Sequence, residues 1–203
     1  STKVGQRNFD AKIIVRQKSH KPIIIGKAGS MLEAAGAKAR EKIEVFLELC
    51  RKDAVIPKYS RPGDAGMDVY AAEEVVINPG ETVIVPTGLK LAIPEGYEIQ
   101  VRPRSGISLN TPLRVANSPG TIDSGYRDEL GIILSNTSLS GNCGHEMLTI
   151  DNKGNKSGPY RIRKGDRIAQ IVLMPVPRIE FKLVDSVSSI GNNRGGGFGS
   201  TGV

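Results

Sequence analysis

Turn-forming residues recur at short intervals from residue 43 onward, and they limit the length of any regular element between them. The turn signals are Pro62-Gly63, Pro79-Gly80, Glu95-Gly96, Pro119-Gly120 and Lys164-Gly165-Asp166. Between them lie runs rich in strand-forming residues: Thr82–Pro86, Leu89–Ile93, Tyr97–Arg102, Leu130–Leu134, Tyr160–Arg163 and Ile168–Met174. Many short strands joined by Gly/Pro turns, with little helix, predict an all-β sandwich, jelly roll or barrel.

The ends of this β region are marked by changes in residue pattern. Residues 43–49 alternate between apolar and mostly charged side chains, which predicts an amphipathic strand. Residues 138–158 are polar and rich in Gly, Asn and Ser, so we expect a long loop there. Residues 191–203 are nearly half glycine with a single aromatic residue, a composition that cannot pack a core. We therefore predict a β body of residues 42–190 and a mobile tail of residues 191–203.

The positive charge belongs to the N-terminal segment alone. Residues 1–42 hold ten Lys/Arg against three Asp/Glu, whereas the eighteen of each in residues 43–203 cancel. Residues 1–41 are therefore predicted to form a separate basic arm, with a possible hairpin around Ile13–Ile25 and a short helix after Ser30. The arm is either a packing element with a solvated face or a contact for nucleic acid. No nucleic-acid motif was identified in it, and its role stays open.

Composition excludes several classes of protein. No apolar run approaches the length of a membrane span and no signal peptide opens the chain, so we expect an intracellular, cytoplasmic protein. The nucleus, an organelle or a virion are the alternative locations. Cys50 and Cys143 are too few for a disulfide framework or a zinc site, and His20 and His145 lack companion ligands. Common motifs for phosphate-binding loops, zinc proteases and esterases are absent from the sequence.

Five polar or glycine-rich segments interrupt the strand pattern. They are Ala65–Asp68, Arg102–Gly106, Gly120–Arg127, Lys164–Gln170 and Arg194–Gly202. In the third segment a turn presents Asp123, which can activate a water molecule, and Tyr126, whose ring can lie against a ligand. Guanidinium groups in the second segment suit phosphate binding. In the last segment, Phe198 in a glycine loop suits a lid over a nucleotide base. Each segment taken singly also fits an ordinary turn or linker.

Together and in this order, the five segments resemble the five motifs of the trimeric dUTPase family. The resemblance covers about residues 43–203. It implies a homotrimer of jelly-roll-like β-barrels that hydrolyses dUTP to dUMP and diphosphate with Mg²⁺, which keeps uracil out of DNA and supplies dUMP for dTMP synthesis. It further implies active sites between subunits, closed by the C-terminal tail of another chain.

The resemblance also implies roles for individual residues. Asp123 would be the base that activates the attacking water, and Tyr126 would pack on the deoxyribose and exclude a 2′-hydroxyl. The uracil would be recognised by Asn117 and the main chain of Gly120, Thr121, Ile122 and Gly131. Phosphates would be held by Arg104, Ser105, Gly106, Gln170 and Arg194. Asp68 would lie near Mg²⁺ and act through water, because the triphosphate holds most of the metal. In the lid, Phe198 would stack on uracil, and Gly199, Ser200 and Thr201 would close over the phosphates.

Two positions depart from the family pattern. Aligned on Phe198, Asn193 takes the place of the arginine of the fifth motif, so whether Asn193 or Arg194 fills that place stays open. Asp128 stands where the third motif commonly has glycine.

Two alternative functions come from different classes. A dCTP deaminase of the same superfamily, alone or bifunctional, would carry a catalytic Glu on the strand after the third motif, where Gly131–Leu134 is apolar. The other alternative is a regulator that binds nucleic acid or protein through the basic arm. The intact Asp123, Tyr126 and Phe198 favour the hydrolase.

Overall fold

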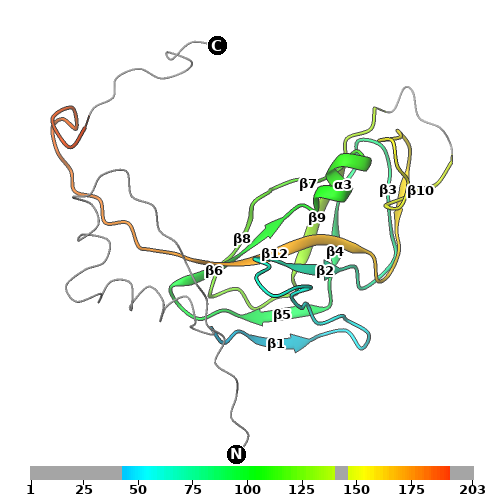
Figure 1. The fold of residues 1–203 in the computed structure, drawn as a ribbon, viewed down its shortest axis with the longest axis horizontal. Helices are drawn as coiled ribbons and strands as arrows, with labels where there is room; N and C mark the ends of the chain where they lie inside the picture. Colours follow the sequence, from blue (N-terminus) through cyan, green and yellow to red (C-terminus); the bar gives the residue numbers. More distant parts are fainter. Residues whose placement is uncertain (1–42, 140–145, 193–203) are drawn as a thin grey trace, which may run out of the picture. The chain divides into compact units, whose positions relative to one another are not determined.

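The computed structural model describes residues 43–139 and 146–192, and this part of the chain is mostly β-structure (Figure 1). By its contacts the chain divides between Glu44 and Val45 into two units, and the second unit carries every strand described below. A mostly β fold, as the turn signals predict, is thereby confirmed.

The largest sheet has four strands in the order β2-β12-β6-β8, and all neighbours are antiparallel. Its strands are β2 (Met67–Tyr70), β12 (Arg167–Pro175), β6 (Tyr97–Arg102) and β8 (Gly120–Ile122). The long β12 pairs with β2 through its first half and with β6 from Gln170 to Pro175. Strands that are distant in the sequence thus become neighbours, which determines where the site lies.

Three smaller sheets complete the body. Their orders are β4-β9-β7, β10-β11-β3 and β1-β5. The strands are β1 (Phe46–Leu49), β3 (Val75–Ile77), β4 (Thr82–Pro86), β5 (Leu89–Ala92), β7 (Leu113–Val115), β9 (Gly131–Asn136), β10 (Leu148–Thr149) and β11 (Tyr160–Ile162). Of these pairs only β10 and β11 run parallel.

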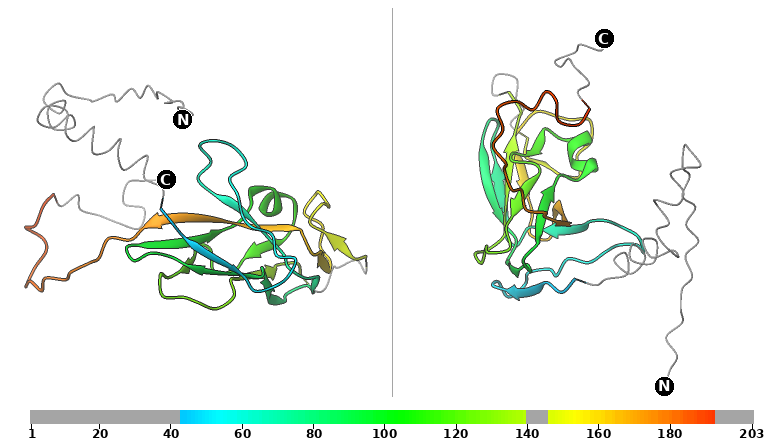
Figure 2. Two further views of the ribbon diagram at one scale, coloured as in Figure 1. Left: turned by 90° about the horizontal axis from the view of Figure 1, so that it is seen from below. Right: turned by 90° about the vertical axis from the view of Figure 1, so that its left-hand side faces the viewer.

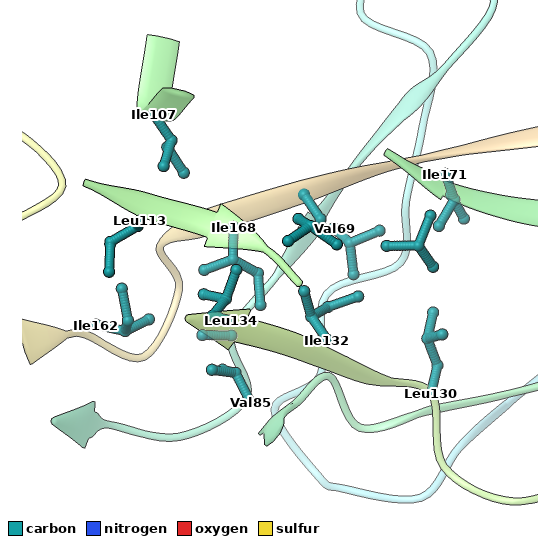
Figure 3. Packing of buried hydrophobic residues seen from close by; sticks show 14 of the residues in the cluster. Val69, Val85, Ile107, Leu113, Leu130, Ile132, Leu134, Ile162, Ile168 and Ile171 are labelled. Atoms are coloured by element: carbon teal, nitrogen blue, oxygen red, sulfur yellow. The ribbon is translucent and has the colours of Figure 1, made fainter. Parts of the chain in front are cut away.

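One hydrophobic core lies between the sheets. Figure 3 shows Val69 of β2, Ile132 and Leu134 of β9 and Ile168 of β12 gathered in it. None of these four side chains is more than 1% exposed. The alternation along β9 explains the packing, because Ile132, Leu134 and Asn136 are buried while the residues between them are half-buried.

All six predicted strand runs coincide with or overlap strands of the structure. Thr82–Pro86 and Tyr97–Arg102 are β4 and β6, residue for residue. The N-terminal strand is shorter than predicted: β1 begins at Phe46 instead of Ile43, since Phe46 already lies opposite Ala92, the last residue of β5. The expected loop of residues 138–158 contains β10 in its described part.

A short helix, α3 (Ser105–Asn110), was not predicted. Its residues are mostly poor helix formers, so local propensity does not explain it. Ile107 is buried against the core, and the Thr111 hydroxyl donates a hydrogen bond to the Ile107 carbonyl at 2.8 Å. Burial of one apolar side chain and capping of the C-terminal turn therefore account for the helix.

After β12 the chain leaves the sheets as an irregular segment, residues 176–192, coloured orange to red in Figures 1 and 2. The Val176 N–H donates to the Gly96 carbonyl at 2.8 Å. Beyond that contact Ile179, Phe181 and Leu183 are 78%, 91% and 98% exposed. We call residues 176–192 the C-terminal strap. Such apolar exposure on a single chain is typical of a surface that another chain covers.

The cysteines, the histidines and possible membrane spans were also considered in the sequence. Cys50 is a free, exposed thiol. Cys143, His20 and His145 lie outside the described residues. Among the helices of the described segments, none has the length and apolar character needed to cross a membrane.

Candidate active site

Three of the five predicted segments meet at one end of the four-stranded sheet. Asp68 on β2 lies opposite Gln170 on β12, and Gln170 lies opposite Arg102 on β6. Arg104 follows β6 and precedes α3. The segments converge because the strands that carry them are neighbours, and residues opposite each other on adjacent strands present their side chains on the same face.

Asp68 is the centre of this group. Its side chain is 9% exposed, and both carboxylate oxygens accept hydrogen bonds. Arg104 Nε donates to Oδ1 at 2.9 Å and Arg104 NH2 donates to Oδ2 at 3.4 Å. Gln170 Nε2 adds a bond to Oδ1 at 3.2 Å, and Arg167 NH1 adds one to Oδ2 at 3.3 Å. The carboxylate therefore orients three side chains that can reach a ligand.

The surroundings of Asp68 also set its charge. Burial works to raise the pKa of the carboxyl, but hydrogen bonds and charge from Arg104, Gln170 and Arg167 outweigh burial and lower the pKa below its ordinary value of 3.8. Asp68 is thus ionised at neutral pH and stabilises its guanidinium partners. These donors occupy both of its oxygens.

An open groove of about 700 Å³ lies over the group, and its four arginines outnumber its two carboxylates, Asp64 and Asp68. Arg61, Arg102, Arg104 and Arg167 line it, together with Ser105 and Gln170. Guanidinium groups bind phosphate oxygens through paired hydrogen bonds, so this lining suits a polyphosphate. A second hollow of about 360 Å³ shares Arg104 and Arg167 with the groove and includes Gly106.

Ser105 and Gly106 are the first two residues of α3, and both are exposed. A Cβ atom added to Gly106 would meet nothing within 4 Å. Packing among the described residues therefore does not require glycine at position 106.

The third segment forms the turn between β8 and β9. Asp123 directly follows β8 and is exposed, and among the described residues no hydrogen bond reaches its carboxylate. The Tyr126 N–H donates to the Asp123 carbonyl at 3.1 Å and closes the turn. The Tyr126 ring is 38% exposed, and its hydroxyl donates to the Glu129 carbonyl at 2.9 Å. We call residues 120–131 the motif-three hairpin.

The side chain of Asn117 packs on the start of this hairpin. A Cβ atom added to Gly120 would lie 3.0 Å from Asn117 Nδ2, so a side chain at position 120 would displace the amide. At the other end, a Cβ atom on Gly131 would lie 2.5 Å from Ile84 Cγ2. Both glycines thus leave room for a neighbouring side chain, and a larger residue at either position would force Asn117 or Ile84 to move.

The family model of dUTPase matches residues 52–141 and 146–202. The deoxyuridine 5′-triphosphate nucleotidohydrolase of Clostridium tetani (strain Massachusetts / E88) is 40% identical over 157 residues, which cover 77% of this chain and 94% of the relative. The same enzyme of Anaeromyxobacter sp. (strain Fw109-5) is 46% identical over 147 residues, or 72% of this chain and 87% of the relative. The chain belongs to the dUTPase family.

Solved dUTPase structures agree with this assignment. The dUTPase of Staphylococcus bacteriophage 80alpha with dUPNHPP is 37% identical, with a TM-score of 0.71, and the match covers 79% of this chain and 99% of that chain. A mutant dUTPase of S. aureus phage phi11, described with a structural Mg(II) ion, is 31% identical, with a TM-score of 0.64 and coverage of 71% and 99%.

A second family model, that of the KH domain, matches residues 3–49. Sequence reasoning missed this match. The available signal was Gly26-Lys27-Ala28-Gly29, which fits the Gly-x-x-Gly loop with which KH domains clamp a nucleic-acid backbone. All four residues lie outside the described part of the chain.

Within one dUTPase chain, Asp123 does not reach the Asp68 group. Ile122, the last residue of β8, lies opposite Ile99, which is three residues along β6 from Arg102. Three residues of strand span about 10 Å, and Asp123 lies one residue further in the same direction. The predicted catalytic base and the predicted phosphate residues are thus at separate places on the same sheet.

The departure at Asp128 does not place a non-glycine residue in a strained backbone conformation. Asn155, with φ of 51°, is the only non-glycine residue with positive φ in residues 43–139 and 146–192. Asp128 thus has a conformation that any residue adopts, which explains why glycine is not needed there.

Sequence reasoning singled out the guanidinium groups of Arg102 and Arg104 for phosphate and gave a specific site role to Arg104, but it did not select Arg61 or Arg167. Arg102 and Arg167 lie inside the predicted segments, and Arg61 directly precedes Pro62-Gly63. Strand register brings Arg102 and Arg167 to the groove, and the folded loops place Arg61 and Arg104 beside them. The predicted lid residues Arg194, Phe198, Gly199, Ser200 and Thr201, and the alternative Asn193, lie outside the described residues.

Proposed function

We propose that this chain hydrolyses dUTP to dUMP and diphosphate by attack of an Asp123-activated water on the α-phosphorus. The dUTP diphosphatase activity follows from family membership, with relatives at 40% and 46% identity over most of the chain. The single structural observation in favour of this chemistry is the groove, which four arginines line and in which Arg104, Arg167 and Gln170 bind the ionised Asp68. Such a site suits a triphosphate and would favour a polyanion over an uncharged substrate.

Asp123 is well placed to be the base. It is exposed at the end of a rigid strand, and among the described residues nothing hydrogen-bonds to its carboxylate, so an incoming water can occupy it. A carboxylate with free oxygens can orient a water for in-line attack and accept its proton as the P–O bond forms. Cations of the groove would stabilise the negative charge that develops on the phosphoryl oxygens.

The motif-three hairpin would bind the nucleoside. Main-chain groups of Gly120, Thr121 and Ile122, with the Asn117 amide, would recognise uracil. The Tyr126 ring would lie against C2′ of the sugar, where a 2′-hydroxyl would collide with it, so UTP would be rejected by steric conflict.

Mg²⁺ fits this site as a metal carried mainly by the substrate. Among the described residues no group of three or more His, Cys, Asp or Glu side chains could hold a metal ion. Mg²⁺ commonly binds through phosphates and water with only one or two carboxylates. When bound, it would neutralise phosphate charge and help to fix the triphosphate. Asp68 is the predicted carboxylate near the metal, and it would act through water; because its oxygens already accept four hydrogen bonds, a Mg²⁺-bound water would have to replace one of these donors.

Separation of the two parts of the site supports a homotrimer with shared active sites. Asp123 and the Asp68 group lie apart within one chain, so a complete site needs the hairpin of one subunit beside the groove of another. The exposed apolar side chains of the C-terminal strap supply a surface for such an assembly. Light scattering coupled to gel filtration tests the trimer, and a monomeric enzyme with full activity would contradict it.

We further assign residues 42–190 to the catalytic body and residues 191–203 to a lid, in which Phe198 would stack on uracil. Truncation before Gly191 should remove most activity while the oligomer stays folded. Undiminished turnover by the truncated chain would dismiss the lid.

A nucleotide panel tests the proposed function most directly. The protein is incubated with dUTP, dCTP, UTP and dTTP, and both diphosphate and ammonia are measured. We expect diphosphate from dUTP alone. Ammonia from dCTP would establish the deaminase alternative, which the apolar Gly131–Leu134 disfavours because that enzyme needs a catalytic Glu there.

The KH match favours nucleic-acid binding as a second function. Residues 3–49 match the KH family, and residues 1–42 carry the whole excess of positive charge. Gly26–Gly29 would approach the backbone of a single strand, with Lys27 contributing charge. A salt-dependent gel shift with single-stranded RNA or DNA should disappear in a Lys27→Asp, Ala28→Asp double variant. Retention of the shift would contradict the assignment, and unchanged dUTP turnover would show that the catalytic body is intact in the variant.

A further inference from the structure

Arg51 connects the end of the first strand to the motif-three hairpin. Its Nε donates to Glu129 Oε1 at 2.8 Å and its NH2 donates to Glu129 Oε2 at 3.1 Å, which makes a two-pronged contact. The third nitrogen, NH1, donates to Glu73 Oε2 at 2.8 Å. One guanidinium thus joins the hairpin to the segment that follows β2.

Glu129 also contacts Tyr126, the residue proposed to lie against the sugar. The main-chain carbonyl of Glu129 accepts the hydroxyl of Tyr126 at 2.9 Å. Next along the chain, the Leu130 N–H donates to the Leu89 carbonyl at 2.8 Å, and the Thr87 hydroxyl donates to the Leu130 carbonyl at 2.7 Å. The backbone that holds the Tyr126 hydroxyl is therefore fixed from one side by β-type contacts and from the other by Arg51.

The turn around Gly88 anchors the same contact. The Gly88 N–H donates to Glu129 Oε1 at 2.7 Å, and its carbonyl accepts the Cys50 N–H at 2.9 Å. Gly88 has φ of +73°, and a Cβ atom there would lie 2.6 Å from Ala54 Cβ and 3.0 Å from Arg51 Cβ. The chain next to Arg51 is thus packed directly on the backbone that binds Glu129, which leaves the guanidinium little freedom.

A plain surface ion pair would not have these features. Exposed pairs contribute little because water screens them and two flexible side chains must be ordered. Here the Arg51 and Glu129 side chains are 39% and 27% exposed, and the fork is supported by a backbone donor. Interaction with Arg51 is the largest of the influences that lower the pKa of Glu129, which keeps the carboxyl ionised. Among the ion pairs of the described residues, this one alone reaches the motif-three hairpin.

We propose that Arg51 and Glu129 are positioning residues for Tyr126, and that their paired contact sets how closely the tyrosine ring approaches the sugar of the nucleotide. The inference rests on the proposed role of Tyr126 against C2′ of the deoxyribose. Neither residue touches the substrate. Their effect is on the choice between a deoxyribonucleotide and a ribonucleotide, because a ring that can retreat leaves room for a 2′-hydroxyl.

The test is a comparison of kcat/KM for dUTP and for UTP in matched variants of the full chain. Arg51→Ala removes the fork, and Tyr126→Phe removes only the hydroxyl that binds the Glu129 carbonyl. We expect each to lower the ratio of the two kcat/KM values roughly tenfold, the size expected when one hydrogen bond to a fixed group is lost. The double variant should be no worse than either single one, since both break the same connection.

Three further variants separate positioning from folding. Arg161→Ala breaks the exposed ion pair that Arg161, on β11, forms with Glu74. This variant should leave the ratio of kcat/KM for dUTP to that for UTP unchanged. Arg51→Lys keeps the charge and one donor, and it should restore part of the ratio. Tyr126→Ala tests the underlying role. If Tyr126→Ala leaves the ratio unchanged, the role of Tyr126 itself is wrong.

Two results would overturn the inference on Arg51 while leaving dUTP hydrolysis and the role of Tyr126 intact. The first is relaxed selectivity in Tyr126→Ala together with an unchanged ratio in Arg51→Ala. The second is additive loss in the Arg51→Ala, Tyr126→Phe double variant, since two independent effects cannot share one connection.

Discussion

The groove around Asp68 and the motif-three hairpin are built in opposite ways. In the groove, the reactive side chains are held by charge: Asp68 accepts hydrogen bonds from Arg104, Arg167 and Gln170 before any ligand arrives. In the hairpin, the backbone is held and the reactive side chains are free, with Asp123 exposed and Tyr126 tied only by its hydroxyl.

The difference reflects what each region has to do. A phosphate site gains from donors that are already oriented, because their ordering then costs nothing when the anion binds. A base must keep its lone pairs available for water, so ion pairs around Asp123 would oppose its function. The predictions below test this contrast, from the largest expected effect to the smallest.

The largest effect should come from Asp123→Asn. The amide cannot accept the proton of water, so we expect diphosphate release from dUTP to fall by about a thousandfold or more. Nucleotide binding, measured by calorimetry with a non-hydrolysable dUTP analogue, should stay within severalfold of the wild type. Asp128→Asn on the same hairpin is the matched control and should retain activity. Wild-type turnover by Asp123→Asn would refute its role as the base.

Gly88→Ala should lower the free energy of unfolding more than any other alanine substitution proposed for this region. It adds a clash with Ala54 Cβ at 2.6 Å to an unfavourable φ of +73°, so we expect a loss of about 3 kcal/mol in the free energy of unfolding. Gly80→Ala has a similar φ of +77° but open space around it, and it should cost only about 1 kcal/mol. Urea titration distinguishes them, and equal costs would show that the packing at Gly88 is irrelevant.

Asp68→Asn should weaken the groove without touching the hairpin. One oxygen acceptor becomes an NH₂ group that faces guanidinium donors, so we expect a loss of about 2 kcal/mol in stability and a raised KM for dUTP. The control, Asp53→Asn, breaks the exposed pair with Lys164 and should cost no more than about 0.5 kcal/mol. A raised KM with unchanged dUTP:UTP selectivity would show that the groove and the hairpin act independently. Altered selectivity would contradict this division of roles.

The smallest expected effect is on how the melting temperature depends on pH in the acid range. Contacts with Arg51 lower the pKa of Glu129 below 4.5, and at Asp68 the guanidinium and amide donors outweigh burial and lower the pKa below 3.8. A carboxyl whose pKa is lower in the folded state stabilises the fold fully above its ordinary value and loses that contribution as pH falls through the folded pKa. Melting temperature should therefore begin to fall below about pH 4.5. Glu129→Gln should flatten the upper part of this decline and Asp68→Asn the part below pH 3.8. Unchanged curves would contradict both assignments.

Strands were predictable where strand composition stands out between turn signals, and β11 shows that a strand of three residues, Tyr160–Ile162, can meet that condition. Thr82–Pro86 and Tyr97–Arg102 are long enough to show strand composition between turn signals, and the structure confirms them. β7 and β8 have three residues each, too few to display a period, and they form because β9 and β6 lie beside them. The helix α3 was also missed, because it depends on the burial of Ile107, which is a tertiary contact and leaves no local signal in the sequence.

The candidate site was predictable in its parts. Asp68, Arg104, Asp123 and Gln170 were identified because each stands in a segment that breaks the strand pattern and matches a family motif. Arg51 and Glu129 carry no such signal. They are 78 residues apart, Arg51 outside the five segments and Glu129 just beyond the third, and only the folded chain shows that they form a fork.

By itself the sequence determined the chemistry of this protein: which carboxylate, ring, guanidinium and amide groups are present, and that turns hold them in a β body. Tertiary structure decided which of these groups meet. The pairing of β2, β12 and β6 brings Asp68, Gln170 and Arg102 into one row, while the antiparallel course of β8 carries Asp123 away from it. Strand register is set by contacts between distant segments, and that is why the division of the site into two parts could not be derived from the order of the residues.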